Sequence, residues 1–216
     1  MPKVVDRTER RTELAEAVWR VIRRDGLEHA SVGNVAREAG LSMGSLRHYF
    51  STQSELLIFA LRLVIERIDQ RLTTLHPDAE PRQAAERFLA ELLPLDADRR
   101  AENEVWLAYT ARAQVDPALR ALRDEGYDLL RQACLRWVEA LAGPRADHEL
   151  EADRLFALLD GLAVHVAMRP DQASPDRVRA VLARHLDELA AHCAGSSASP
   201  PTECLESHVR VHRSLG

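Results

Sequence analysis

The segment SVGNVAREAGLSMGSLRHYF, residues 31–50, constrains the fold of this 216-residue chain more than any other stretch. Ser31 and Ser42 each precede a short helical run, and serine is a favoured residue at a helix N-cap. The tripeptide AGL between the two runs supplies a tight turn. Leu46 and Phe50 lie four positions apart, so both can face inward from the second run. This layout predicts a helix-turn-helix whose second helix is free to recognise DNA.

The rest of the chain also reads as helical. It is rich in the helix formers Ala, Leu, Arg and Glu, and its 46% hydrophobic and 29% charged residues are typical of a globular protein. Apolar stripes at helical spacing predict nine helices and no strand, hence an all-α fold. Besides the pair within 31–50, the expected helices are 7–25, 54–74, 82–93, 98–114, 117–142, 147–168 and 174–194.

Three regions follow from this pattern. Residues 1–53 form a three-helix helix-turn-helix domain, and residues 54–194 form a six-helix bundle. The helix at 54–74 could couple the two mechanically. Residues 195–216 begin with GSSASPPTE, which cannot bury enough apolar surface to order itself, so we expect a flexible tail.

Charge and motif content limit the function classes. The net charge is −5, yet residues 1–50 carry nine Lys/Arg against seven Asp/Glu, which favours a DNA contact at the N-terminal end. Three scattered cysteines and the lack of an apolar run of about 18 residues predict a cytoplasmic protein without membrane contact. No nucleophile elbow, phosphate loop or HExxH motif occurs, so we expect neither an enzyme nor a cofactor.

Residues 31–57 resemble the DNA-binding signature of the TetR family of bacterial transcriptional regulators. Residues 105–130 and 158–168 are similar to the C-terminal regulatory domain of BetI-like members. The resemblance implies a homodimeric, ligand-responsive repressor that binds a palindromic operator and is released by a small-molecule effector. The matching positions of the signature are Val35-Ala36, Ala39-Gly40-Leu41-Ser42, Gly44, Leu46, Tyr49-Phe50 and Glu55-Leu56-Leu57.

The resemblance also assigns roles to residues of the recognition segment. Gly44 would let the helix approach DNA closely, and His48 is either a phosphate contact or a solvated residue. Base edges would be read by Met43, Ser45 and Arg47, and phosphates would be contacted by Ser31, Ser42, Tyr49 and Gln53.

Two positions depart from the family pattern. Arg47 stands where members usually carry a tyrosine, and it places a potential guanine reader on the groove-facing side. Gln53 stands where members carry a lysine, so the salt dependence of DNA binding should be slightly shallower.

Candidate effector contacts lie in the C-terminal region, and each has a structural alternative. Aromatic residues at helical spacing are commonly core residues, and Asp160 and His165 can be satisfied polar residues at a helix interface beside Gly161. The candidates are Phe88, Trp106, Tyr109, Thr110, Trp137, Asp160 and His165.

The last two helices carry more apolar residues than one face needs, and the resemblance implies that they pair with their twins as a dimer interface. These residues are Leu155, Leu158, Leu159, Leu162, Val166, Val178, Val181, Leu182, Leu186 and Leu189.

A metal site at the C-terminal end was considered and is not predicted. Cys204, His208 and His212 are spaced four apart, as ligands on a helix would be, but the segment HVRVHR alternates rather than following a helical period. A small-molecule binding module or helical enzyme with a vestigial helix-turn-helix is the second function class, supported by Gln53 and the acidic total. Replacing Arg47 discriminates between the two classes, because only a regulator would lose DNA binding.

Overall fold

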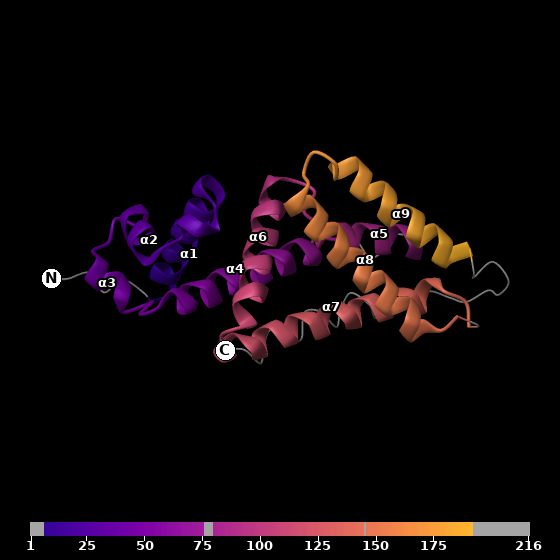
Figure 1. Ribbon diagram of the computed structural model, residues 1–216, viewed down its shortest axis with the longest axis horizontal. Coiled ribbons are helices and arrows are strands. Elements are labelled where there is room, and N and C mark those ends of the chain that lie inside the picture. Colours follow the sequence, from indigo (N-terminus) through magenta and orange to yellow (C-terminus); the bar gives the residue numbers. More distant parts are fainter. Residues whose placement is uncertain (1–6, 76–79, 145, 192–216) are drawn as a thin grey trace. The chain divides into compact units, whose positions relative to one another are not determined.

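A computed structural model describes residues 7–75, 80–144 and 146–191, with side chains from residue 10 onward. Within these ranges the chain forms α-helices and two short 3-10 turns and contains no strand (Figure 1), which confirms the all-α prediction. The elements are α1 (Arg7–Asp25), η1 (Leu27–His29), α2 (Val32–Glu38), α3 (Met43–Arg47), α4 (Gln53–Thr73), α5 (Pro81–Glu91), α6 (Ala97–Ala113), η2 (Pro117–Leu119), α7 (Arg120–Leu141), α8 (His148–Met168) and α9 (Pro175–Ala191).

The helices divide into two compact units. Unit 1 comprises residues 1–66 with 101–120, and unit 2 comprises residues 67–100 with 121–216. The helices α4 and α6 each run through both units, since the dividing points fall inside them. Most of α6 therefore groups with the N-terminal helices, although the sequence pattern had placed it in the bundle at 54–194.

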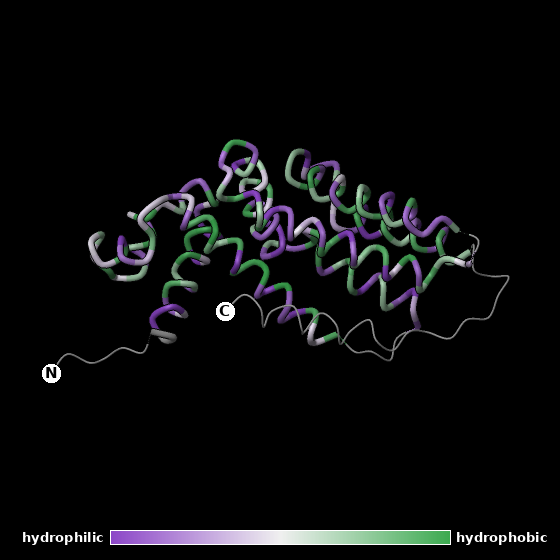
Figure 2. The backbone as a smooth tube through the Cα atoms, turned by 90° about the horizontal axis from the view of Figure 1, so that it is seen from below, coloured by the Kyte–Doolittle hydropathy of each residue, from purple (hydrophilic) through white to green (hydrophobic). Residues whose placement is uncertain are grey.

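The core of unit 1 is made by α1 against α2 and α3. Val18 and Val21 on the inner stripe of α1 are fully buried, as are Val35 on α2 and Leu46 on α3. Figure 2 shows hydrophobic and hydrophilic residues alternating along the helices, as amphipathic helices require. Phe50 extends this core, because its ring lies 4.9 Å from that of Phe59 on α4.

The turn between α2 and α3 depends on one glycine. Gly40 has φ +65°, a left-handed conformation that a residue with a Cβ adopts only at a cost. The N–H of Leu41 donates to the carbonyl of Ala36 at 2.9 Å, and the N–H of Gly40 donates to that of Arg37 at 3.2 Å. This pair of bonds is a Schellman cap, which ends α2 and redirects the chain into α3.

Three helix ends differ from their predicted places. The recognition helix was expected to reach Phe50, but α3 ends at Arg47 and the N–H groups of residues 49 and 50 both bond to the Leu46 carbonyl. Pro117 opens a 3-10 turn, so α7 begins at Arg120. Thr52, rather than Ser54, caps α4 by accepting from the Glu55 N–H at 3.1 Å.

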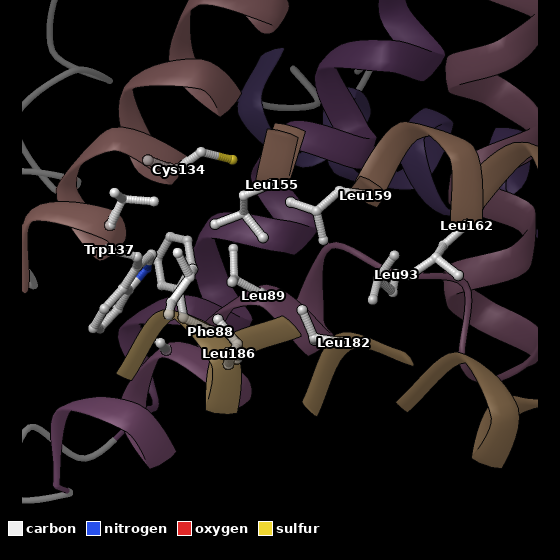
Figure 3. Packing of buried hydrophobic residues seen from close by; sticks show 14 of the residues in the cluster. Phe88, Leu89, Leu93, Cys134, Trp137, Leu155, Leu159, Leu162, Leu182 and Leu186 are labelled. Atoms are coloured by element: carbon white, nitrogen blue, oxygen red, sulfur yellow. The ribbon is translucent and has the colours of Figure 1, made fainter. Parts of the chain in front are cut away.

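The core of unit 2 is formed by α5, α7, α8 and α9. Figure 3 shows Leu155 and Leu159 of α8 directed toward Leu89 of α5 and Leu182 of α9, and all four are at most 3% exposed. The side chain of Arg82 joins α5 to α9 through the Asp187 carboxylate at 2.8 Å and the Ala183 carbonyl at 3.1 Å. These contacts make α5 and α9 neighbours although the bonded residues are 101 and 105 positions apart in sequence.

No helix in the described ranges combines the length and apolarity that crossing a membrane would require. The predicted tail at 195–216, with Cys204, His208 and His212, lies outside the described residues.

Candidate nucleic-acid interface and effector region

The helix α3 presents its predicted base-reading side chains to solvent. Leu46 is the buried anchor of this five-residue helix, at 0% exposure. Met43 is 47% exposed, and Ser45 and Arg47 are also exposed. One buried residue therefore fixes the helix to the unit while Met43, Ser45 and Arg47 stay accessible to solvent, although the Met43 sulfur also lies beside Gly33 of α2. Accessible side chains on a short anchored helix are the arrangement needed to enter a DNA groove.

The two serines predicted as caps take that position in the structure. The Ser31 hydroxyl accepts from the Asn34 N–H at 3.2 Å, and the Ser42 hydroxyl accepts from the Ser45 N–H at 3.0 Å. A second hydrogen bond joins the Ser42 and Ser45 hydroxyls, whose oxygens lie 2.8 Å apart. The start of α3 is thus held by local bonds, so its exposed side chains leave from a fixed backbone.

Gly44 has no structural reason within its own chain to be a glycine. Its φ is not positive, and a Cβ added there would meet only the Ser42 Oγ, at an ordinary 3.8 Å. Glycine inside a helix costs about 1 kcal/mol relative to alanine. Gly44 is the second residue of α3 and lies on its exposed side, where the chain leaves room for a larger side chain.

The other predicted phosphate contacts are exposed but differ in their local bonds. Tyr49 is 48% exposed, and His48 is also exposed. Gln53 lies at the first position of α4, and its Nε2 donates to the Ala30 carbonyl at 3.0 Å. Sequence reasoning missed this role for Gln53, which ties the start of α4 to the turn before α2.

An ion-paired carboxylate that the sequence did not reveal fixes α2 on α1. Glu38 accepts from Arg20 Nε at 2.8 Å and from an Arg24 guanidinium nitrogen at 2.9 Å. These hydrogen bonds, first that from Arg20 and then that from Arg24, lower the pKa of Glu38 below its ordinary 4.5. The tie lies just before the Gly40 turn, so it restrains the backbone that leads into α3.

The predicted effector residues do not gather at one place. Phe88 and Trp137 lie in the buried core of unit 2, with ring centroids 5.6 Å apart. Tyr109 in unit 1 is fully buried, and its hydroxyl donates to the Leu119 carbonyl at 3.0 Å. Thr110 bonds to the Leu107 carbonyl of its own helix. Trp106 is half-buried on α6, and His165 is exposed on α8.

Asp160 is the predicted effector residue with the most distinctive surroundings. Its carboxyl is half-buried on α8, and burial raises its pKa. Within the described part of the chain, we find no hydrogen bond or ion pair to this carboxyl. On α7, burial and then the charge of Asp160 raise the pKa of Tyr127. The same two causes raise the pKa of the Cys134 thiol to about 12. An acidic group thus lies between α8 and α7 without a cation of its own.

An aromatic pair accompanies this carboxyl. The rings of Tyr127 on α7 and Phe156 on α8 meet edge to face, with centroids 5.7 Å apart. Sequence reasoning missed both residues. The spacing of Phe156 four positions before Asp160 was the available signal, because residues four apart share a helix face.

The apolar residues expected at a dimer interface are largely used inside the protomer. Eight of the ten lie in the core of unit 2, and Leu158 and Val181 pack against that core. A different set on α8 is exposed: Leu150 at 55%, Val164 at 38% and Met168 at 67%. On the same helix, a Cβ added to Gly161 would meet nothing within 4 Å of its own chain. An apolar strip with a central glycine is therefore left on the surface of α8.

Comparison with known proteins assigns the class of this fold. Residues 81–191 match the family described as BetI-type transcriptional repressor, C-terminal. The chain is 39% identical to the HTH-type transcriptional regulator PksA of Bacillus subtilis, over 88% of this chain and 94% of that protein. The chain belongs to the TetR family of transcriptional regulators, as the signature at residues 31–57 predicted. It is a ligand-responsive DNA-binding regulator and not an enzyme.

Solved structures agree with this assignment. A transcriptional regulator of Rhodococcus sp. Rha1 superimposes with a TM-score of 0.74 at 30% identity, over 87% of this chain and 99% of that one. A regulator of Saccharomonospora viridis, solved in complex with choline, has a TM-score of 0.69 at 26% identity, over 86% and 97%.

The Glu38 ion pairs generate a pH-dependent prediction. Because the folded state lowers the pKa of Glu38, its contribution to stability is complete above the ordinary value of 4.5 and is lost as the pH falls through the folded value. Glu38→Gln should therefore lower the melting temperature at pH 7, and the decrease should be smaller at pH 3. Thermal melts followed by circular dichroism at both pH values measure this.

Glu139→Gln, which changes an exposed carboxylate on α7, serves as the control and should leave the melting temperature unchanged at both pH values. An equal loss for Glu38→Gln at pH 7 and pH 3 would assign the effect to packing rather than charge.

Proposed function

We propose that the chain is a homodimeric repressor that binds a palindromic operator through α3 and leaves it when an organic cation binds beside Asp160. The observation that carries the DNA-binding part is the exposure of α3 around a single buried anchor, Leu46. Such a regulator acts in the cytoplasm, where it meets its DNA.

In this proposal α3 lies in the major groove with Met43, Ser45 and Arg47 at the base edges. Arg47 supplies the strongest discrimination, because a guanidinium can donate two hydrogen bonds to guanine O6 and N7. Gly44 allows the backbone of α3 to come close to the DNA. Phosphates are contacted by Ser31, Ser42, His48, Tyr49 and Gln53.

The effector class follows from the chemistry around Asp160. A half-buried carboxylate without a cation of its own is electrostatically unsatisfied, and an entering cation would relieve it. Tyr127 and Phe156 offer the aromatic rings over which a quaternary ammonium group binds. The relative from Saccharomonospora viridis was solved with choline, a ligand of this class. We therefore propose a quaternary or similarly apolar ammonium compound as the effector.

Release of DNA requires that the effector favour one arrangement of the chain over another. A ligand shifts an equilibrium only by the difference in its affinity for the two states. The helices α4 and α6 are continuous through both units, so a change in unit 2 has a covalent route to the helix-turn-helix. We propose that effector binding moves α4 and so changes the separation of the two recognition helices in the dimer.

The dimer interface in this proposal is the exposed strip of α8, paired with its two-fold equivalent together with α9. Leu150, Val164 and Met168 supply the apolar surface. Gly161 lets the partner helix approach, which explains a mid-helix glycine that its own chain does not require. Two-fold pairing also presents two recognition helices to the two halves of a palindrome.

The DNA-binding proposal predicts a loss of specific binding in Arg47→Ala. Removing a bidentate guanine contact should cost about 1–3 kcal/mol and relax the base preference at one position of each half-site. Mobility-shift titrations against the DNA upstream of the gene, at fixed moderate salt, measure both effects. Arg131→Ala is the matched control, because Arg131 is paired with Glu149 and Asp153 in unit 2 and should not alter DNA affinity.

The wild-type protein must first bind and shift a palindromic DNA fragment in that titration. If it shifts no such fragment, the proposal of an operator-binding regulator is wrong. If Arg47→Ala binds as tightly as the wild type, Arg47 does not read a base.

The effector proposal predicts that Asp160→Asn weakens choline binding. Loss of the carboxylate charge should raise the dissociation constant at least about tenfold, equivalent to about 1.4 kcal/mol. Isothermal titration calorimetry on the full chain measures it, with Glu139→Gln as the carboxylate control. Unchanged affinity in Asp160→Asn would remove Asp160 from the effector site.

The interface proposal predicts that Val164→Arg produces monomers. A charge buried between two copies of α8 is costly, whereas in the monomer the same position is exposed. Sedimentation velocity at micromolar concentration distinguishes the two states. Gln132→Arg adds the same charge at an exposed position of α7 and should remain dimeric. A dimeric Val164→Arg variant would move the interface away from this strip.

A further inference from the structure

Unit 1 contains a cavity separate from the exposed face of α3. Its volume is about 520 Å³, within the range typical of small-molecule sites. Three elements supply its walls: the turn at residues 26–30, the first two turns of α4, and α6. Much of the lining is apolar, from Leu27, Leu56, Leu57 and Ala108.

Two carboxylates stand in the wall of this cavity. Glu28 comes from η1 and Glu104 from α6, so they approach the cavity from different elements. Burial and then the negative charge of Glu28 raise the pKa of Glu104, while Arg23 partly opposes this. Among the described residues, no ion pair supplies a cation to Glu104. Both carboxylates are exposed at the cavity wall, and the Glu28 carboxylate also lies 3.6 Å from His29 Nδ1. The like charges of the two acids repel, and the leucines and alanines of the lining offer no cation.

This combination selects the kind of ligand. An anion would be repelled by both carboxylates. A bound Ca²⁺ takes six to eight oxygen ligands, and nowhere do the described residues gather three or more His, Cys, Asp or Glu side chains in a metal-binding arrangement. An organic cation suits both features, because its charge meets the carboxylates and its hydrocarbon part meets the leucines.

We propose that this cavity binds an aliphatic diamine or polyamine, with its ammonium groups at Glu28 and Glu104 and its methylene chain along Leu27, Leu56 and Leu57. The site is distinct from the effector site proposed beside Asp160, and it does not depend on the proposed operator binding. A chain of methylenes between two ammonium groups matches a pair of carboxylates separated by apolar surface.

Occupation of this site would join three elements of unit 1. The turn at 26–30 leads directly into Ser31, the cap of α2, and Gln53 at the cavity wall already bonds to Ala30. A ligand bridging this turn to α4 and α6 binds only the folded unit, so it should raise the melting temperature of the protein by mass action.

The test is calorimetric titration of the full chain with 1,6-diaminohexane at pH 7.5 and low salt, with 1,6-hexanediol as the uncharged probe of the same length. The diamine should bind and raise the melting temperature, and the diol should do neither. Glu104→Gln and Glu28→Gln should each weaken diamine binding by about twofold to fivefold, because an exposed ion pair contributes up to about 1 kcal/mol. Because the Glu28 side chain is 84% exposed, its variant keeps the test valid even if Glu104→Gln is destabilised.

Glu139→Gln should bind the diamine as the wild type does. The proposal is overturned if the diamine does not bind, if the diol binds equally, or if both glutamate variants keep full affinity. Loss of diamine binding in Asp160→Asn would instead place the diamine at the effector site, and displacement of the diamine by equimolar CaCl₂ would indicate a metal site. These binding measurements do not involve DNA, so their results test the cavity independently of the proposed operator binding.

Discussion

The burial of Leu46, the one buried residue of α3, is the feature on which the DNA-binding surface depends. With only five residues, α3 cannot hold a helical conformation on its own, since isolated helices of that length are not stable in water. Its position comes from Leu46, from the Ser42 cap and from the Schellman turn at Gly40. With the helix held by those three contacts, Met43 and Arg47 stay exposed to an external surface.

Carboxylates in this protein fall into two groups with opposite surroundings. In the first group the carboxylate accepts hydrogen bonds from its own chain, and its pKa is lowered. This group contains Glu38, Glu55 and Asp96. Asp160 is half-buried and Glu104 is exposed, and the pKa values of both carboxyl groups are raised. The first group holds helices and turns in place, whereas the second marks positions where a cation from outside would improve the electrostatics.

Two helical glycines, Gly44 near the start of α3 and Gly161 within α8, are not required by the packing of their own chain. Gly44 and Gly161 lower the intrinsic stability of α3 and α8, and neither is required by a positive φ or by a close neighbour in the chain. Both lie on surfaces for which we propose an external partner, DNA for Gly44 and a second copy for Gly161. Gly40 differs, because its left-handed backbone conformation by itself favours glycine at that position.

The sequence by itself determined the all-α fold, most helix positions, the two serine caps and the family, because caps, periodicity and glycine turns are local signals. Only the tertiary structure decided which apolar residues of α8 and α9 serve the core, since both faces of α8 carry apolar residues and periodicity cannot rank them. Other features also join residues that are far apart in the chain. They are the ion pairs of Glu38, the contact of Tyr127 with Phe156, and the cavity lined by Glu28 and Glu104. Such contacts depend on how helices pack, and no local pattern encodes them.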